Sequence, residues 1–83
     1  MKIHVFIQEA CFAVNCGEGT QDLRWLGNVA VMRYELAAGV DLGEVVCITT
    51  DDNSETSLDQ DAKICSVLSD GEKVRVKTEN SLL

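Results

Sequence analysis

The chain contains no proline, one histidine and only four aromatic residues: one tryptophan, one tyrosine and two phenylalanines. Positive charge is also scarce, because seven Lys and Arg stand against fourteen Asp and Glu, which gives a formal net charge of −7. Binding to nucleic acid needs a basic surface that neutralises phosphates, so this balance argues against a nucleic-acid partner. The 83 residues are enough for one small domain, which excludes a large multi-substrate enzyme.

Long apolar runs are missing as well. No stretch approaches the roughly 18 consecutive apolar residues that a membrane-spanning helix needs. Residues 1–8 alternate between apolar and polar side chains and lack the continuous apolar run of a secretory signal. We therefore expect no membrane insertion and a cytoplasmic, reducing location.

The four cysteines, Cys11, Cys16, Cys47 and Cys65, are an even set that would allow two disulfides in a secreted protein. Each of them lies in or beside an apolar segment, and 46% of the residues are hydrophobic, enough for a core without disulfides. The sequence thus predicts free, buried thiols. Cys11 and Cys16 have the spacing of two iron–sulfur ligands, but the C-x2-C continuation is absent, so we expect neither a metal nor a cofactor.

Catalysis would need a nucleophile or an acid–base pair with an orienting partner. His4, the only histidine, alternates with Ile3 and Val5 in a pattern typical of a strand. The sequence identifies no catalytic residue. We therefore predict a non-enzymatic protein that acts through its surface.

Hydrophobic periodicity predicts strands over residues 2–8, 11–15, 45–50 and 73–77, a helix over 21–38, and a short helix within 58–68. Thr20 is placed to cap the long helix, and Gly39 ends it. Hairpin, helix, strand, short helix, strand is the order of an α+β, ubiquitin-like β-grasp. In that fold the first and last strands are neighbours in a mixed sheet. We assign residues 1–78 to the domain and 79–83 to a tail or the start of a linker.

Charge is distributed unevenly along the chain. Residues 51–61 contain five acids and no base, whereas Lys73, Arg75 and Lys77 alternate with valines and so share one face of the last strand. Opposite charges on one small domain favour head-to-tail contact between copies. The alternative is that both regions are solvated surfaces that keep the protein soluble.

The second strand, residues 11–15, is uncharged and lacks the lysine, proline or bulge that usually prevents further pairing at a sheet edge. Such an edge can accept another strand, unless a neighbouring loop covers it. A contact that joins this edge to a different patch on the next copy does not close on itself. It would produce a ring or a filament.

Several motifs within this order point to one family. They are Cys16-Gly17-Glu18-Gly19, Trp25-Leu26, Arg33-Tyr34, Leu58-Asp59-x-Asp61 and Cys65-x-Val67-x-Ser69-Asp70. Together they resemble the N-terminal domain family shared by partitioning-defective 3 polarity scaffolds and histidine ammonia-lyases. In the scaffold branch, the resemblance implies a domain similar to DIX and Phox-and-Bem domains. Such a domain self-associates front to back into helical filaments and concentrates the scaffold at the cell cortex.

The resemblance also implies where copies meet. It places one side of the contact at Ala13 on the second strand and the other side at the acidic turn, at Asp70 or, in a competing register, Ser69. The full set of predicted self-association residues is Cys11, Ala13, Asn15, Asp59, Asp61, Ser69, Asp70, Lys73, Arg75 and Lys77.

Two alternatives stay open. The first is a hetero-binding adaptor whose acidic residues 51–61 bind a basic patch on a related β-grasp domain. The second is an N-terminal accessory domain of a histidine ammonia-lyase-like protein, because Trp25-Leu26-Gly27 is closer to that branch. The large catalytic region of the lyases and their internal Ala-Ser-Gly triplet are absent from these 83 residues.

Overall fold

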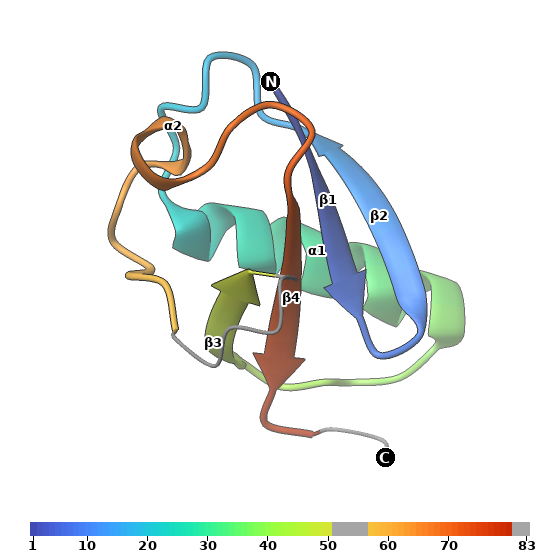
Figure 1. The fold of residues 1–83 in the computed structure, drawn as a ribbon. Helices are drawn as coiled ribbons and strands as arrows, with labels where there is room; N and C mark the ends of the chain where they lie inside the picture. The colour runs from blue at the N-terminus through green and yellow to red at the C-terminus, as the bar shows by residue number, and fades with distance from the viewer. Residues whose placement is uncertain (51–56, 81–83) are drawn as a thin grey trace.

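The computed structural model describes residues 1–50 and 57–80. Its elements are β1 (Lys2–Ile7), β2 (Ala10–Asn15), α1 (Leu23–Ala38), β3 (Val45–Thr50), α2 (Ile64–Val67) and β4 (Lys73–Thr78). Helix α1 packs across one face of a four-stranded mixed sheet (Figure 1). The predicted α+β class and the β-grasp-like order of elements are confirmed.

The strand order in the sheet is β2-β1-β4-β3. The central pair, β1 and β4, is parallel, and each central strand has an antiparallel partner on its outer side. The first and last strands are therefore neighbours, as expected. This order leaves β2 at one edge of the sheet and β3 at the other (Figure 1).

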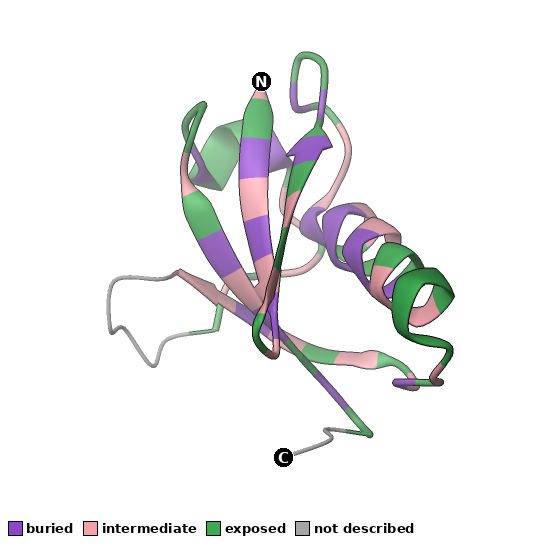
Figure 2. Cartoon of the chain, turned by 90° about the vertical axis from the view of Figure 1, so that its right-hand side faces the viewer, coloured by how far each residue is buried: buried purple, intermediate pink, exposed green. Residues whose placement is uncertain are grey.

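The core lies between the sheet and α1. Strand residues alternate between the two faces, so Ile3, Val5 and Ile7 point towards the helix and are at most 1% exposed. Val74 of β4 continues this layer, and Leu26 of α1 packs on it from the other side. Figure 2 shows the alternation as buried bands along the strands. Burying one such side chain stabilises the fold by about 1.5–3 kcal/mol.

Strand β1 ends one residue earlier than the sequence predicts. Gln8 has a φ of 56°, a left-handed conformation that does not continue a strand, and it begins the turn to β2. At the other end of the chain, Glu79 and Asn80 donate backbone N–H groups to the carbonyls of Glu44 and Leu42. The start of the segment assigned to a tail is thus bonded to the loop before β3.

Helix α1 begins at Leu23, with Asp22 as its N-cap. The Asp22 carboxylate accepts the backbone N–H of Trp25 at 2.9 Å, so the prediction that Thr20 caps the helix is wrong. Asp22 itself is still extended, with a ψ of 166°, and the helix begins only after it, which moves the cap two positions along the chain. Gly39 ends the helix as predicted, since it adopts the left-handed conformation at φ 69° and donates to the Glu35 carbonyl.

We predict that Asp22→Ala lowers the free energy of unfolding by about 1 kcal/mol, because the Trp25 N–H loses its acceptor. Thr20→Ala is the matched control, and it should change stability by less than about 0.5 kcal/mol, as surface substitutions usually do. Chemical denaturation followed by circular dichroism measures both. An equal loss in the two variants would contradict the capping assignment.

Candidate functional site

Strand β2 presents an uncharged row of side chains at the sheet edge. Cys11, Ala13 and Asn15 are exposed on the face away from α1. The alternate residues point inward, where the Phe12 ring meets Tyr34 edge to face with centroids 6.4 Å apart. This packing fixes β2 against the helix, so the exposed row is held in a defined orientation.

The backbone of this edge is partly covered by Arg33 of α1, whose Nη1 donates to the Ala13 carbonyl at 3.0 Å. Backbone groups alternate in direction along a strand. Because the Cys16 N–H is directed at Met1, the Ala13 carbonyl points away from β1 and towards the open edge. Arg33 therefore occupies one edge acceptor and brings a positive charge to an edge that is uncharged in its own sequence.

Sequence reasoning missed this role of Arg33. The residue stood only in the Arg33-Tyr34 motif of the resemblance, and its contact is with a residue 20 positions earlier in the chain. Only the packing of α1 across β2 brings the two together. No periodicity within either element reports this contact.

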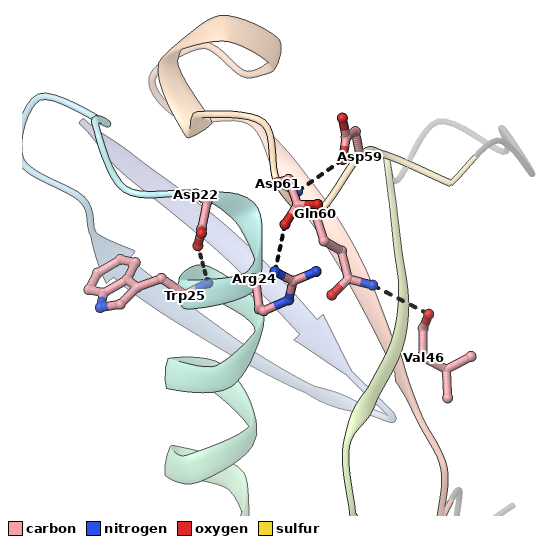
Figure 3. A network of polar contacts seen from close by, with 7 residues as sticks. All are labelled: Asp22, Arg24, Trp25, Val46, Asp59, Gln60 and Asp61. Carbon is pink, nitrogen blue, oxygen red and sulfur yellow. Dashed lines mark hydrogen bonds and ion pairs between the residues drawn. The ribbon is translucent and has the colours of Figure 1, made fainter.

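The opposite edge, at β3, is closed by the segment that follows residue 56. Leu58 donates its backbone N–H to the Ile48 carbonyl at 2.7 Å. The Gln60 side chain donates to the Val46 carbonyl at 3.4 Å (Figure 3). These two carbonyls are therefore unavailable to a strand from another molecule. A β2 edge that approached this side would have to bind through side chains.

Two of the predicted acids, Asp59 and Asp61, lie in the segment beside β3. Asp59 accepts the Asp61 backbone N–H at 2.9 Å, and Asp61 forms an ion pair with Arg24 at 2.5 Å (Figure 3). The Gln60 carbonyl accepts the backbone N–H of Arg24, so the segment is fixed to the start of α1. Both partners of the ion pair are more than half exposed, which limits its strength to about 0–1 kcal/mol. The other three predicted acids, Asp51, Asp52 and Glu55, lie outside the described residues.

Asp70 lies at the start of β1, apart from Asp59 and Asp61. Its carboxylate accepts the backbone N–H of Lys2 at 2.7 Å, which fastens the turn of Ser69 and Asp70 to the start of β1. In the sheet, Lys2 pairs with Asn15 of β2. Asp70 is thus near the end of the β2 edge, whereas Asp59 and Asp61 are beside the opposite edge. The two residues that the resemblance gave to opposite sides of the contact, Ala13 and Asp70, lie in the same half of the sheet.

The predicted basic face of β4 is present. Val74 and Val76 are buried, while Lys73 and Lys77 are exposed on the other face of the sheet, opposite α1 (Figure 2). Arg75 lies on that face with its guanidinium carbon 5.5 Å from the centre of the Phe6 ring.

These cations are continuous with the β2 edge. His4 of β1 is the register partner of both Ala13 on β2 and Lys73 on β4. Residues in register across neighbouring strands share a face, so one row runs from Ala13 through His4 to Lys73. The uncharged edge residues and the cations of β4 form one surface.

All four cysteines are free, as predicted, but the prediction that they are buried holds only for Cys16. Cys11 projects from the outward side of the edge strand, and Cys65 projects from the four-residue helix α2; both are exposed. Cys47 is half-buried. Burial raises the pKa of the Cys16 thiol, because the low-dielectric interior disfavours the thiolate.

Two properties of the described residues bear on other functions. No group of three or more His, Cys, Asp or Glu side chains there could hold a metal ion. Within the same residues, no helix is long and apolar enough to cross a membrane.

A family model described as the N-terminal of Par3 and HAL proteins matches residues 1–81. No curated protein matches the chain. The match covers every helix and strand of the structure.

The exposure of the cysteines predicts their reactivity. At mildly alkaline pH, iodoacetamide should modify Cys11 and Cys65 in the native protein. Cys16 should react only after unfolding, because it is buried and its raised pKa leaves less thiolate. Mass spectrometry of timed digests measures each site. Modification of native Cys16 as fast as Cys11 would contradict the structure of this edge.

Proposed function

Because the chain belongs to the family found at the N-terminus of Par3 and HAL proteins, we propose that it is a non-enzymatic self-association module. Copies join front to back into open oligomers or helical filaments. Within a larger protein, this concentrates the scaffold that carries the domain, in the cytoplasm and at the cell cortex. The observation that carries the proposal is the difference between the two edges of the sheet.

We name two surfaces. The edge surface consists of Cys11, Ala13 and Asn15 of β2, Arg33 of α1, and Lys73, Arg75 and Lys77 of β4. The acidic surface consists of Asp59 and Asp61 in the segment that closes β3. The β2 residues and Arg33 lie at one edge of the sheet and the acidic surface lies beside the other, with the cations of β4 on the sheet face between them. A copy that binds through its β2 edge therefore leaves its acidic surface available. A heterologous contact of this kind builds an open assembly.

Opposite charge would steer the contact. The edge surface carries the cations of β4 and Arg33, and the acidic surface carries two exposed carboxylates. Charge complementarity of this kind raises the rate of encounter and fixes the register more than it increases affinity. Ala13 has a small side chain that buries little apolar area, so each contact is weak and assembly requires concentrated protein.

The turn of Ser69 and Asp70 offers a second register. Asp70 is exposed and acidic, as the contact with an edge surface requires, but its carboxylate also anchors Lys2. Asp70 is close to β2 in its own molecule. In this register the next copy would therefore be rotated relative to its orientation in the Asp59 register. The Asp59 register places the two contacts on opposite edges, and we favour it for that reason.

A pair of variants tests the proposal. Ala13→Asp should disable the edge surface by repelling the next copy's carboxylates, and Asp59→Lys should disable the acidic surface. Each variant alone should stay monomeric. Their equimolar mixture should stop at a heterodimer, because each partner supplies one intact surface and one blocked surface. Analytical ultracentrifugation distinguishes monomer, dimer and polymer.

Asp70→Asn is the matched control for the register, since its amide oxygen can still accept the Lys2 N–H while the charge is removed. Assembly that persists in Asp70→Asn and is lost in Asp59→Lys selects the Asp59 register, and the reverse selects the Asp70 register. Long polymers formed by the mixture of Ala13→Asp and Asp59→Lys would overturn the two-surface arrangement. An unmodified chain that stays monomeric, and that in a pull-down recovers a different β-grasp domain rather than itself, would favour the adaptor alternative.

A further inference from the structure

A groove of about 400 Å³ lies between α1 and the start of β3. Asn28 and Glu35 line it from the helix, Glu44 and Val45 from the strand side, and Gln60 from the segment that closes β3. None of the self-association residues in the edge or acidic surfaces lines this groove. It lies next to the acidic surface, because Gln60 stands between Asp59 and Asp61 in the chain.

The lining of the groove is negative. Glu44 is exposed, and Glu35 is held in place because its Oε2 accepts the backbone N–H of Leu42 at 2.8 Å. Arg24 also lines the groove, but its guanidinium forms an ion pair with Asp61, which is outside the lining. A cationic group in the groove could therefore meet two carboxylates, one of them already fixed in orientation.

The surroundings of the groove restrict how a second molecule can bind there. The Val46 and Ile48 carbonyls at this edge are occupied by Gln60 and Leu58. An incoming chain would have to insert a side chain because strand pairing with these carbonyls is blocked. The groove has room for one long side chain, because its volume of about 400 Å³ is within the roughly 300–1,000 Å³ of pockets that hold drug-sized ligands.

Arg33 has the chemistry that this groove fits. It is exposed on the edge surface, and the Ala13 carbonyl accepts from Nη1, one of the five N–H donor positions that a guanidinium presents in a planar fork. Such a fork binds carboxylates in two-point fashion. Arg33 reaches the β2 edge, whereas the groove lies between α1 and β3. Arg33 and Glu35 are two positions apart on α1, which separates them by about 200° around the helix, so within one molecule they face different sides of α1.

We propose that the groove between α1 and β3 is a socket for Arg33 of the next copy, with Glu44 and Glu35 as its carboxylate partners. This inference rests on the proposed front-to-back self-association and specifies the residue pair at its centre. The socket adds a two-point charged contact to the small Ala13 contact. It also sets the angle between successive copies, because Arg33 is anchored to β2 through the Ala13 carbonyl.

Charge exchange between Arg33 and Glu44 tests the socket. Arg33→Glu and Glu44→Arg should each raise the concentration at which the chain polymerises by at least about tenfold, the scale of losing one close charge pair. The double variant, and equally a mixture of the two single variants, should polymerise within about threefold of the unmodified chain, because the swapped pair restores the contact. Sedimentation velocity measures the midpoint concentrations.

Glu18→Arg is the matched control for Glu44→Arg, because it makes the same change in net charge at an exposed loop position away from the groove. It should leave the midpoint within about threefold of the unmodified chain, since a rim charge distant from the contact contributes little. Circular dichroism melting curves verify that every variant is folded, which matters most for Arg33→Glu, since Arg33 bonds to β2.

The outcomes separate this inference from the proposed function. If the unmodified chain polymerises, Ala13→Asp prevents it, and Glu44→Arg polymerises like Glu18→Arg, the socket is wrong and the front-to-back function stands. Single variants that fail and a double variant that also fails would likewise overturn the pairing of Arg33 with Glu44. If the unmodified chain remains monomeric at every concentration, the proposed function itself is overturned.

Discussion

The parallel pairing of β1 with β4 in the middle of the sheet is the constraint on which the rest of the structure depends. It places the hairpin partner β2 at one edge and β3 at the other, so the two edges are built from different segments. The β2 edge is uncharged in its own sequence and is partly covered by Arg33. The β3 edge is closed by Leu58 and Gln60 and lies beside acids. A molecule with two unlike edges is suited to asymmetric contact.

The charge of −7 is better understood as a distribution than as a sum. Over the described residues, the cations of β4 lie on the uncovered face of the sheet, and Asp59 and Asp61 lie beside β3. The domain measures 31 × 25 × 20 Å, whereas the Debye length at physiological salt is about 8 Å. Charges on distant parts of the surface are therefore screened from one another, and each patch attracts a partner only at short range.

Local patterns were sufficient to predict most of the fold. The alternation of apolar and polar residues in 2–8 and 73–77 predicts that one face of each strand is buried. In the structure those buried faces form part of the core. The helix-ending role of Gly39 also follows from its own conformational freedom. Thr20 and Asp22 show the limit of such reasoning. Both residues are suitable caps, and the choice depends on where the preceding loop turns into the helix.

The features of the candidate site depend on contacts between distant segments, which no local pattern encodes. Arg33 reaches Ala13, and Gln60 reaches Val46, only because α1 and the residue 57–60 segment pack against particular strands. The prediction for the cysteines failed for a related reason, since Cys11 lies in an apolar strand that happens to be at the edge. Sequence reasoning found the composition of the surfaces. The structure determined which residues share one.

The central claim is that one folded copy offers two unlike surfaces that bind one another. Sedimentation velocity of the unmodified chain, over increasing concentration at low and at high salt, tests this claim most directly. The account predicts a sedimentation coefficient that keeps rising with concentration at low salt and falls back towards the monomer at about 1 M salt, where the Debye length is about 3 Å. A strict monomer at every concentration, or a plateau at a closed dimer, would contradict it.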